Sequence, residues 1–273
     1  MPTVPIEGGT LRYRERGEGP PLVWLHGGWQ SADSWGPQVA RFADEYRVVT
    51  FDLRGHGRTG GTDQRTYSVD LFTDDLETLL AHLGVDRPIL GGISLGGMVV
   101  QSYLDRHPDA ARGAVVGGPV QSVPPVDLPP LVKSALSPVP YVSWLLSTVG
   151  PAATFRSLLG SVRATTGRPW LTVDAAVRER AMEALDAVSA SEFRKIFRAL
   201  YTFVPPDLSH VRTPTLVLYG DHEAPPVKRQ GEHLAETVAR GSWREIPGAG
   251  HLVNQDDPEA FNAACAAHFA EAI

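Results

Sequence analysis

The sequence predicts an α/β fold: a mostly parallel β-sheet covered by helices on both faces, with an inserted helical cap. Short apolar runs alternate with segments of helical period through residues 1–120, and the alternation resumes in 209–273. Residues 121–208 contain no evident strand and are proline-rich first and helical afterwards. Because alternating strands and helices build parallel sheets with both faces covered, we expect one core from 1–120 and 209–273, with 121–208 as the cap.

Four apolar runs in the first half of the core have the length and composition of buried strands. They are PLVWLHG (21–27), YRVVTFDLRG (46–55), RPILGG (87–92) and ARGAVVGG (111–118). We expect these runs to be strands of the parallel sheet.

Helical segments separate these strands. Trp35, Val39 and Phe42 follow the i, i+4, i+7 spacing of a helix face, and we expect Ser31 to be the N-cap. Residues 68–83 place their leucines on one face and end at a glycine. The next helix is expected to begin at Ser94.

The same alternation closes the chain. We predict a strand at TPTLVLYG (213–220), a helix near 226–239, a strand around 242–246 and a last helix after Pro258. The preceding cap contains one clear amphipathic helix, whose apolar residues recur at i, i+3, i+4, i+7 and i+8. They are Phe193, Ile196, Phe197, Leu200 and Tyr201.

Composition excludes several classes of protein. A net charge of −6 and a pI near 5.8 argue against nucleic-acid or anionic-membrane partners, which reward a basic surface. The first residues do not show the basic start followed by an apolar stretch that is typical of a signal peptide. No apolar run approaches the roughly 20 residues of a membrane span. The single cysteine, Cys265, excludes an internal disulfide and a cysteine zinc cluster, and we expect it buried on the last helix. A cytoplasmic protein is expected; the oligomeric state is left open.

The stretch LGGISLGGMV (90–99) places Ser94 between two glycine pairs, at a predicted strand-to-helix junction. This is the context of a G-x-S-x-G nucleophile elbow, a turn so sharp that side chains two residues before and after the serine would collide. The N-terminus of the new helix offers free N–H groups where an oxyanion would form. The pattern therefore favours a nucleophilic Ser94.

Three further motifs follow predicted strands. HGG (26–28) comes after the first apolar run, YGDHE (219–223) supplies carboxylates after a late strand, and GAGH (248–251) puts a histidine beyond the last strand. The chain order of serine, acid and histidine is that of the catalytic triads of this elbow type.

On these residues the chain resembles the α/β-hydrolases, in particular the bacterial esterase, lactonase and cofactor-free haloperoxidase group. The stretches that carry the resemblance are LHGGW, FDLRGHGRTG, GGISLGGM, LYGDHE and PGAGH. The resemblance implies Ser94 as nucleophile, His251 as general base, and the N–H groups of Gly28 and Leu95 as oxyanion donors. The nucleophilic aspartate of epoxide hydrolases and haloalkane dehalogenases is absent.

Two carboxylates compete for the role of triad acid. The related families usually have G-D-x-D here, and the second acid, three residues past the glycine, is the catalytic one. That register implies Glu223, with glutamate in place of the commoner aspartate. Asp221 remains the alternative, and otherwise caps the turn by accepting backbone N–H groups.

The function implied is hydrolysis of a small, largely apolar carboxylic ester or lactone through an acyl-enzyme, with no cofactor and no metal. Carbon–carbon bond hydrolysis, or haloperoxidase and perhydrolase chemistry at the same triad, is the main alternative. A ligand-binding receptor on the same scaffold is a minor one. GHGRTG (55–60) matches a dinucleotide-binding pattern, but a turn-rich stretch follows it where that site needs a helix. His26 and His56 are expected to be structural.

Overall fold

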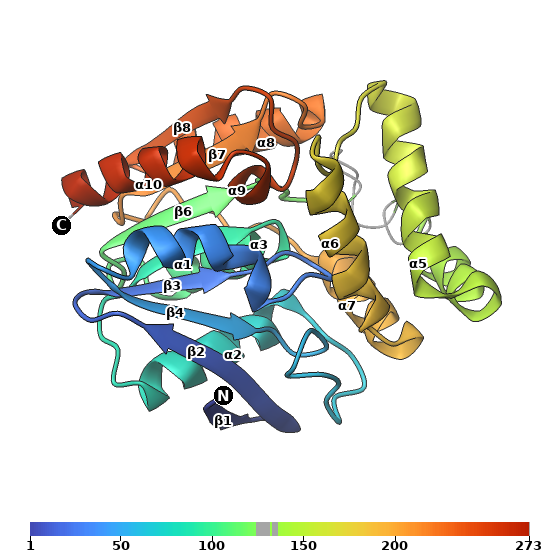
Figure 1. Cartoon of the computed structure of the whole chain (residues 1–273), viewed down its shortest axis with the longest axis horizontal. Coiled ribbons are helices and arrows are strands. Elements are labelled where there is room, and N and C mark those ends of the chain that lie inside the picture. The colour runs from blue at the N-terminus through green and yellow to red at the C-terminus, as the bar shows by residue number, and fades with distance from the viewer. Residues whose placement is uncertain (124–131, 133–135, 273) are drawn as a thin grey trace.

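A computed structural model describes residues 1–123, 132 and 136–272 of the chain, and most of the proline-rich opening of the predicted cap lies outside them. These residues form a sheet of eight strands in the order β1-β2-β4-β3-β5-β6-β7-β8, and Figure 1 shows that the sheet is twisted. From β4 to β8 every neighbouring pair is parallel. The strands are β1 (Thr3–Ile6), β2 (Gly9–Arg16), β3 (Pro21–Leu25), β4 (Arg47–Asp52), β5 (Ile89–Ile93), β6 (Gly113–Gly117), β7 (Thr215–Gly220) and β8 (Gly241–Ile246).

Helices cover both faces of the sheet, as predicted. Figure 1 shows α1 and α10 together on the face toward the viewer, with α2, α3 and α8 on the other face. The core helices are α1 (Gly36–Phe42), α2 (Val69–His82), α3 (Leu95–Arg106), α8 (Pro225–Thr237), the short α9 (Val253–Asp256) and α10 (Pro258–Ala272). None of the described helices is long and apolar enough to span a bilayer.

The sheet begins with a hairpin that the sequence analysis did not identify. β1 and β2 are antiparallel to each other, and β2 is antiparallel to β4. The side chains of β2 alternate between buried and exposed, because one face of this strand packs on the core and the other meets solvent. Gly8, with φ of 72°, makes the turn between the two strands.

One predicted helix differs from the expectation. The segment that follows Ser31 is a 3₁₀ turn, Ala32–Trp35, continued by α1, and the Ser31 side chain accepts no capping hydrogen bond. Asp52 instead accepts the N–H of Ala32 at 2.7 Å. A carboxylate from β4 therefore fixes the start of this segment in place of a local cap.

The insertion between β6 and β7 is helical. It contains α5 (Val139–Thr166), α6 (Ala175–Asp186) and α7 (Ala190–Thr202), and Gly150 has non-helical φ and ψ inside α5. Figure 1 shows these helices beside the sheet, at the end toward which the arrowheads of the parallel strands point. The inserted helices therefore lie over the strand ends, where open α/β sheets bind their ligands.

The interior of the core is apolar and closely packed. Trp24 on β3 stacks on Trp35 at 4.5 Å between ring centroids, and Phe261 and Phe269 of α10 pack around it. Cys265, on the same helix, is completely buried, as the sequence predicted. The Trp24 ring also covers Gly91 of β5, where a Cβ would lie 1.9 Å from it, so this packing joins β3 and β5, from whose ends the candidate site is built.

Candidate active site

Ser94 occupies a strained turn between β5 and α3. Its backbone has φ of 53° and ψ of −113°, a conformation that costs free energy for a residue with a side chain. A Cβ on Gly92 would lie 2.3 Å from the carbonyl of Gly96, and one on Gly96 would lie 2.2 Å from the carbonyl oxygen of Leu25. Only glycine fits at these two positions, as the sequence pattern predicted. The turn leaves Ser94 partly exposed amid a buried segment.

His251 and Glu223 form a buried pair. Glu223 lies three residues beyond the end of β7, and its Oε2 is 2.6 Å from Nδ1 of His251. Both side chains are almost fully excluded from solvent. Ala224 N–H donates to the other carboxylate oxygen at 2.9 Å. A buried carboxylate needs partners of this kind, and the arrangement leaves Nε2 of His251 for a second partner.

Asp221 lies elsewhere. Its carboxylate accepts the N–H of Gly248 at 2.8 Å and remains partly exposed. It therefore joins the turn after β7 to the loop that carries His251. Of the two candidate carboxylates, the structure brings Glu223 to the imidazole and gives Asp221 the turn contact that its position predicted.

The His251 ring lies beside the strand that neighbours Ser94. Ser94 N–H donates to Gly117 O at 2.9 Å, and a Cβ on the next residue, Gly118, would lie 2.9 Å from Cε1 of His251. Among the residues that the structure describes, no hydrogen bond joins the Ser94 hydroxyl to His251. Hydrogen bonds between catalytic side chains are often long in ligand-free enzymes and shorten when substrate binds.

The two predicted oxyanion donors come from the loop after β3 and from the first residue of α3. Gly28 follows β3, and Leu95 opens α3, where backbone N–H groups have no helical partner. No acceptor in the described part of the chain takes either N–H group. A Cβ on Gly28 would lie 4.0 Å from Cβ of Leu95, so the two backbones are close together.

His26 and His56 support the loops around Gly28. Nε2 of His26 accepts the N–H of Leu53 at 3.0 Å, and the two imidazole rings are 4.9 Å apart. Burial lowers the pKa of His26 to about 4 and that of His56 to about 3. Both rings are therefore neutral at pH 7 and hold backbone groups.

Apolar side chains of α7 cover Gly28. Leu200 and Ile196 lie 3.4 and 3.8 Å from the position that a Cβ on Gly28 would take. Trp29, the next residue, stacks on Phe193 of the same helix at 4.6 Å between centroids. The surroundings of the candidate oxyanion site are therefore largely apolar on the side of the insertion.

Trp170, in the loop between α5 and α6, is a site residue that the sequence analysis did not single out. Its indole stacks on the His251 imidazole, with centroids 4.5 Å apart, and its Nε1–H donates to Oε1 of Glu223. In the sequence it is one aromatic among several in the insertion, 53 residues from Glu223. No local pattern indicates this contact.

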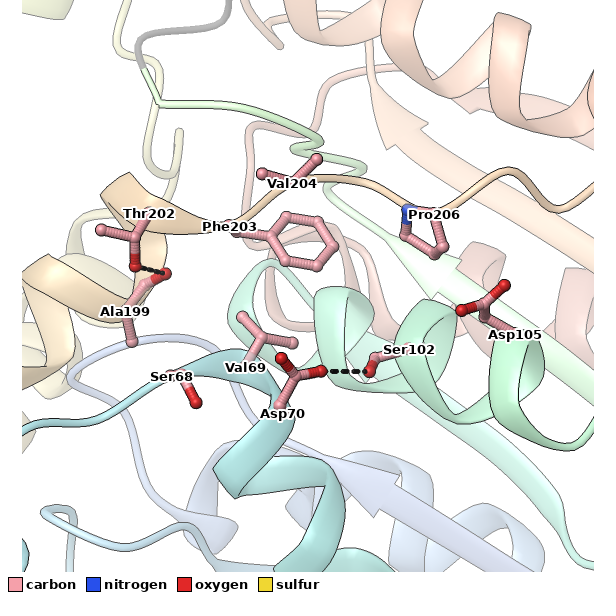
Figure 2. Close-up of a pocket in the computed structure, with 10 residues that line it drawn as sticks. All are labelled: Ser68, Val69, Asp70, Ser102, Asp105, Ala199, Thr202, Phe203, Val204 and Pro206. Atoms are coloured by element: carbon pink, nitrogen blue, oxygen red, sulfur yellow. Dashed lines mark hydrogen bonds between the residues drawn. The ribbon is translucent and has the colours of Figure 1, made fainter. Parts of the chain in front are cut away.

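A separate surface pocket of about 200 Å³ lies away from these residues. Figure 2 shows it between the start of α2, the face of α3 and the chain leaving α7, with Phe203 above it and Asp70 hydrogen-bonded to Ser102. None of the predicted site residues lines it. In the part of the chain that the structure describes, no three His, Cys, Asp or Glu side chains are grouped to hold a metal ion.

Comparison with known proteins gives the family. The model of the alpha/beta hydrolase family matches residues 22–264. A carboxylesterase of Bacillus subtilis is 24% identical over 90% of this chain and 78% of its own length. A non-heme chloroperoxidase of Kitasatospora aureofaciens is 26% identical over 94% of both chains. The crystal structure of an enol-lactonase from Burkholderia xenovorans has a similar fold, with a TM-score of 0.77, 22% identity and coverage of 98% of this chain and 100% of that one.

Proposed function

Because the chain belongs to the alpha/beta hydrolase family, we propose that it is a serine hydrolase that cleaves a carboxylic ester or lactone through an acyl-enzyme at Ser94. The observation that carries this proposal is the strained backbone of Ser94 between two glycines that admit no Cβ. Strain of this kind persists where a reactive side chain has to be presented. The buried His251–Glu223 pair beside it supports the same chemistry.

In this mechanism His251 is the general base. Its Nδ1–H donates to Glu223, so Nε2 takes the proton of the Ser94 hydroxyl while Oγ attacks the substrate carbonyl. The N–H groups of Gly28 and Leu95 hold the tetrahedral oxyanion, and loss of one such donor costs about 10²–10³ in rate. The protonated His251 gives its proton to the leaving alkoxide. A water molecule, deprotonated by His251, then cleaves the acyl-enzyme and restores Ser94.

We expect a small and largely apolar substrate. The supporting observation is that Ile196 and Leu200 lie within 4 Å of the position of a Gly28 Cβ, next to the proposed oxyanion site. The carboxylesterase relative is consistent with an ester. A lactone needs the same chemistry, except that its leaving alkoxide stays attached to the acyl group.

The direct test is turnover of short acyl p-nitrophenyl esters. An acyl-enzyme mechanism predicts a burst of p-nitrophenol equal to the enzyme concentration whenever deacylation is the slower step. A receptor built on this scaffold would bind such compounds without sustained release. Absence of both burst and turnover across esters and lactones of two to eight carbons would contradict the proposal.

A second candidate is perhydrolysis at the same site, favoured by the similarity to the non-heme chloroperoxidase. Hydrogen peroxide would replace water as the nucleophile that attacks the acyl-enzyme, giving a peracid and free Ser94. The test is peracid formation from a short ester in the presence of hydrogen peroxide. A ratio of peracid to carboxylic acid no higher than that of the uncatalysed reaction would exclude it.

A further inference from the structure

A short segment of the insertion is docked against the loop that carries His251. His251 N–H donates to Trp170 O at 2.8 Å, and Leu252 N–H donates to Leu171 O at 2.9 Å. Asp256 joins the two segments from the other side, because its carboxylate accepts both Gly250 N–H at 2.7 Å and Val173 N–H at 3.1 Å. The segment that carries Trp170 is therefore held by two backbone hydrogen bonds and by the Asp256 carboxylate.

The loop is shaped to receive this segment. A Cβ on Gly250 would lie 2.6 Å from the carbonyl oxygen of Trp170 and 3.0 Å from Cα of Thr172. The residue before His251 therefore has to be glycine for the two segments to approach. This contact explains why the second glycine of GAGH is a glycine, and the reason is independent of the conformation of the turn itself.

The Trp170 side chain reaches both members of the buried pair. Glu223 has two carboxylate oxygens: Oε2 faces Nδ1 of His251, and Oε1 accepts from Trp170 Nε1–H and from Ala224 N–H. The indole plane lies over the imidazole, at an angle of 29°. Trp170 thus limits rotation of the carboxylate and tilt of the ring at the same time.

We propose that Trp170 is a positioning residue through which the insertion holds Glu223 and His251 in the geometry needed for proton transfer. This inference rests on the proposed function, and it extends that function from the core to the insertion. If the segment that carries Trp170 moved away, Ser94, His251 and Glu223 would remain. The Glu223 carboxylate would then lose one hydrogen-bond donor, and the imidazole would lose the indole that covers it. Formation of the reactive geometry is then coupled to docking of the insertion.

The kinetic test uses Trp170→Phe, which keeps an aromatic ring and removes the N–H donor. The hydrogen bond that is lost is made to a charged carboxylate, which is the stronger kind, so we expect kcat on a short p-nitrophenyl ester to fall roughly tenfold or more. KM should stay within about twofold because Trp170 acts through the pair. Trp144→Phe is the matched control, since Trp144 is an exposed tryptophan of the same insertion.

A double-mutant cycle separates positioning from general damage. In a Glu223→Gln background the donor no longer meets a carboxylate, so Trp170→Phe should cause little further loss of kcat. Gly250→Ala, which pushes on the Trp170 carbonyl, should lower kcat as Trp170→Phe does. Wild-type kcat in Trp170→Phe, or an equal loss in both backgrounds, would overturn the proposal.

A spectroscopic measurement tests the same point without turnover. The proton between His251 Nδ1 and Glu223 should give a downfield NMR resonance, assigned by its loss in Glu223→Gln. Trp170→Phe should shift or broaden that resonance, and Trp144→Phe should leave it unchanged. An unchanged resonance in Trp170→Phe would refute the positioning role even if the protein hydrolyses no ester. Failure of wild-type turnover with a shifted resonance would instead count against the proposed function alone.

Discussion

Oε2 of Glu223 lies 2.6 Å from Nδ1 of His251, and both side chains are shut off from solvent. The carboxylate two residues earlier, Asp221, points to a different partner, the N–H of Gly248. The turn after β7 thus gives its two acids different surroundings. One acid lies against an imidazole in the interior, and the other braces a surface turn.

This difference predicts opposite effects of two nearly isosteric changes. Glu223→Gln removes the charge that orients His251 and stabilises it when protonated, so kcat should fall by at least about 100-fold with normal folding. Asp221→Asn should keep kcat near the wild-type value and lower the thermal unfolding temperature. Steady-state kinetics and thermal unfolding of both variants check this. Near-normal kcat in Glu223→Gln together with loss of activity in Asp221→Asn would reverse the assignment.

The packing at the elbow predicts that Gly92→Ala destabilises the fold and removes activity together. Its Cβ would meet the backbone of Gly96 at 2.3 Å, and such overpacking costs roughly 3 kcal/mol of unfolding free energy. Gly160→Ala, at an exposed position of α5 with no atom within 4 Å of the new Cβ, is the control. It should stabilise the protein by roughly 0.5–1 kcal/mol. Urea unfolding measures both, and equal stabilities of the two variants would contradict the packing argument.

The buried histidines predict lower stability in acid. Burial lowers the pKa of His26 to about 4 and of His56 to about 3, whereas the unfolded chain binds these protons near pH 6.5. Between those values the unfolded state holds more protons than the native state, so the unfolding free energy decreases as pH falls from about 6.5 to 4. Each histidine contributes up to about 1.4 kcal/mol per pH unit.

His56→Gln isolates this effect, because it removes one of the two groups. The unfolding free energy of the variant should fall less steeply between pH 6.5 and 4.5 than that of the wild type. Urea titrations at several pH values measure the slopes, and His233→Asn, at an exposed position, controls for the loss of a histidine. Parallel slopes in wild type and His56→Gln would show that His56 is protonated in the native state.

The apolar cover over Gly28 predicts a preference among substrates. Leu200→Ala removes contacts close to the proposed oxyanion site, so kcat/KM for a hexanoate ester should fall roughly tenfold more than for an acetate ester. Val204→Ala, at a largely exposed side chain, is the control. Neutral lactones should also be turned over faster than dianionic lactones of equal size. Much faster turnover of the dianionic lactones would refute the apolar site.

The residues around Ser94 were predictable because each requirement is local. A sharp strand-to-helix turn needs glycines two residues away on either side, and the sequence has them at Gly92 and Gly96. The register of Glu223 after β7 came from the resemblance, and the structure shows the contact with His251 that this register implies. Local rules therefore predict the turn around Ser94, and the family resemblance predicts the acid that meets His251.

The features that were missed depend on contacts distant in the chain. β2 is a strand with charged residues on its exposed face, so its sequence lacks an apolar run, although the Gly8–Gly9 pair marks the turn before it. Trp170 meets Glu223 only because the insertion folds back over the strand ends. Ser31 lost its predicted capping role to a carboxylate 21 residues later, Asp52. Such pairings are set by tertiary packing, which overrides local preference.

Ser94 is proposed as the covalent nucleophile, and labelling with a fluorophosphonate probe is the most direct test of that role. We expect one phosphonylated site per chain, on the peptide that contains Ser94, and no labelling of Ser94→Ala. Intact mass and peptide mapping measure both, with far-ultraviolet circular dichroism to verify the fold of the variant. Labelling that persists in Ser94→Ala, or that maps to another peptide of the wild-type protein, would show that Ser94 is not the nucleophile.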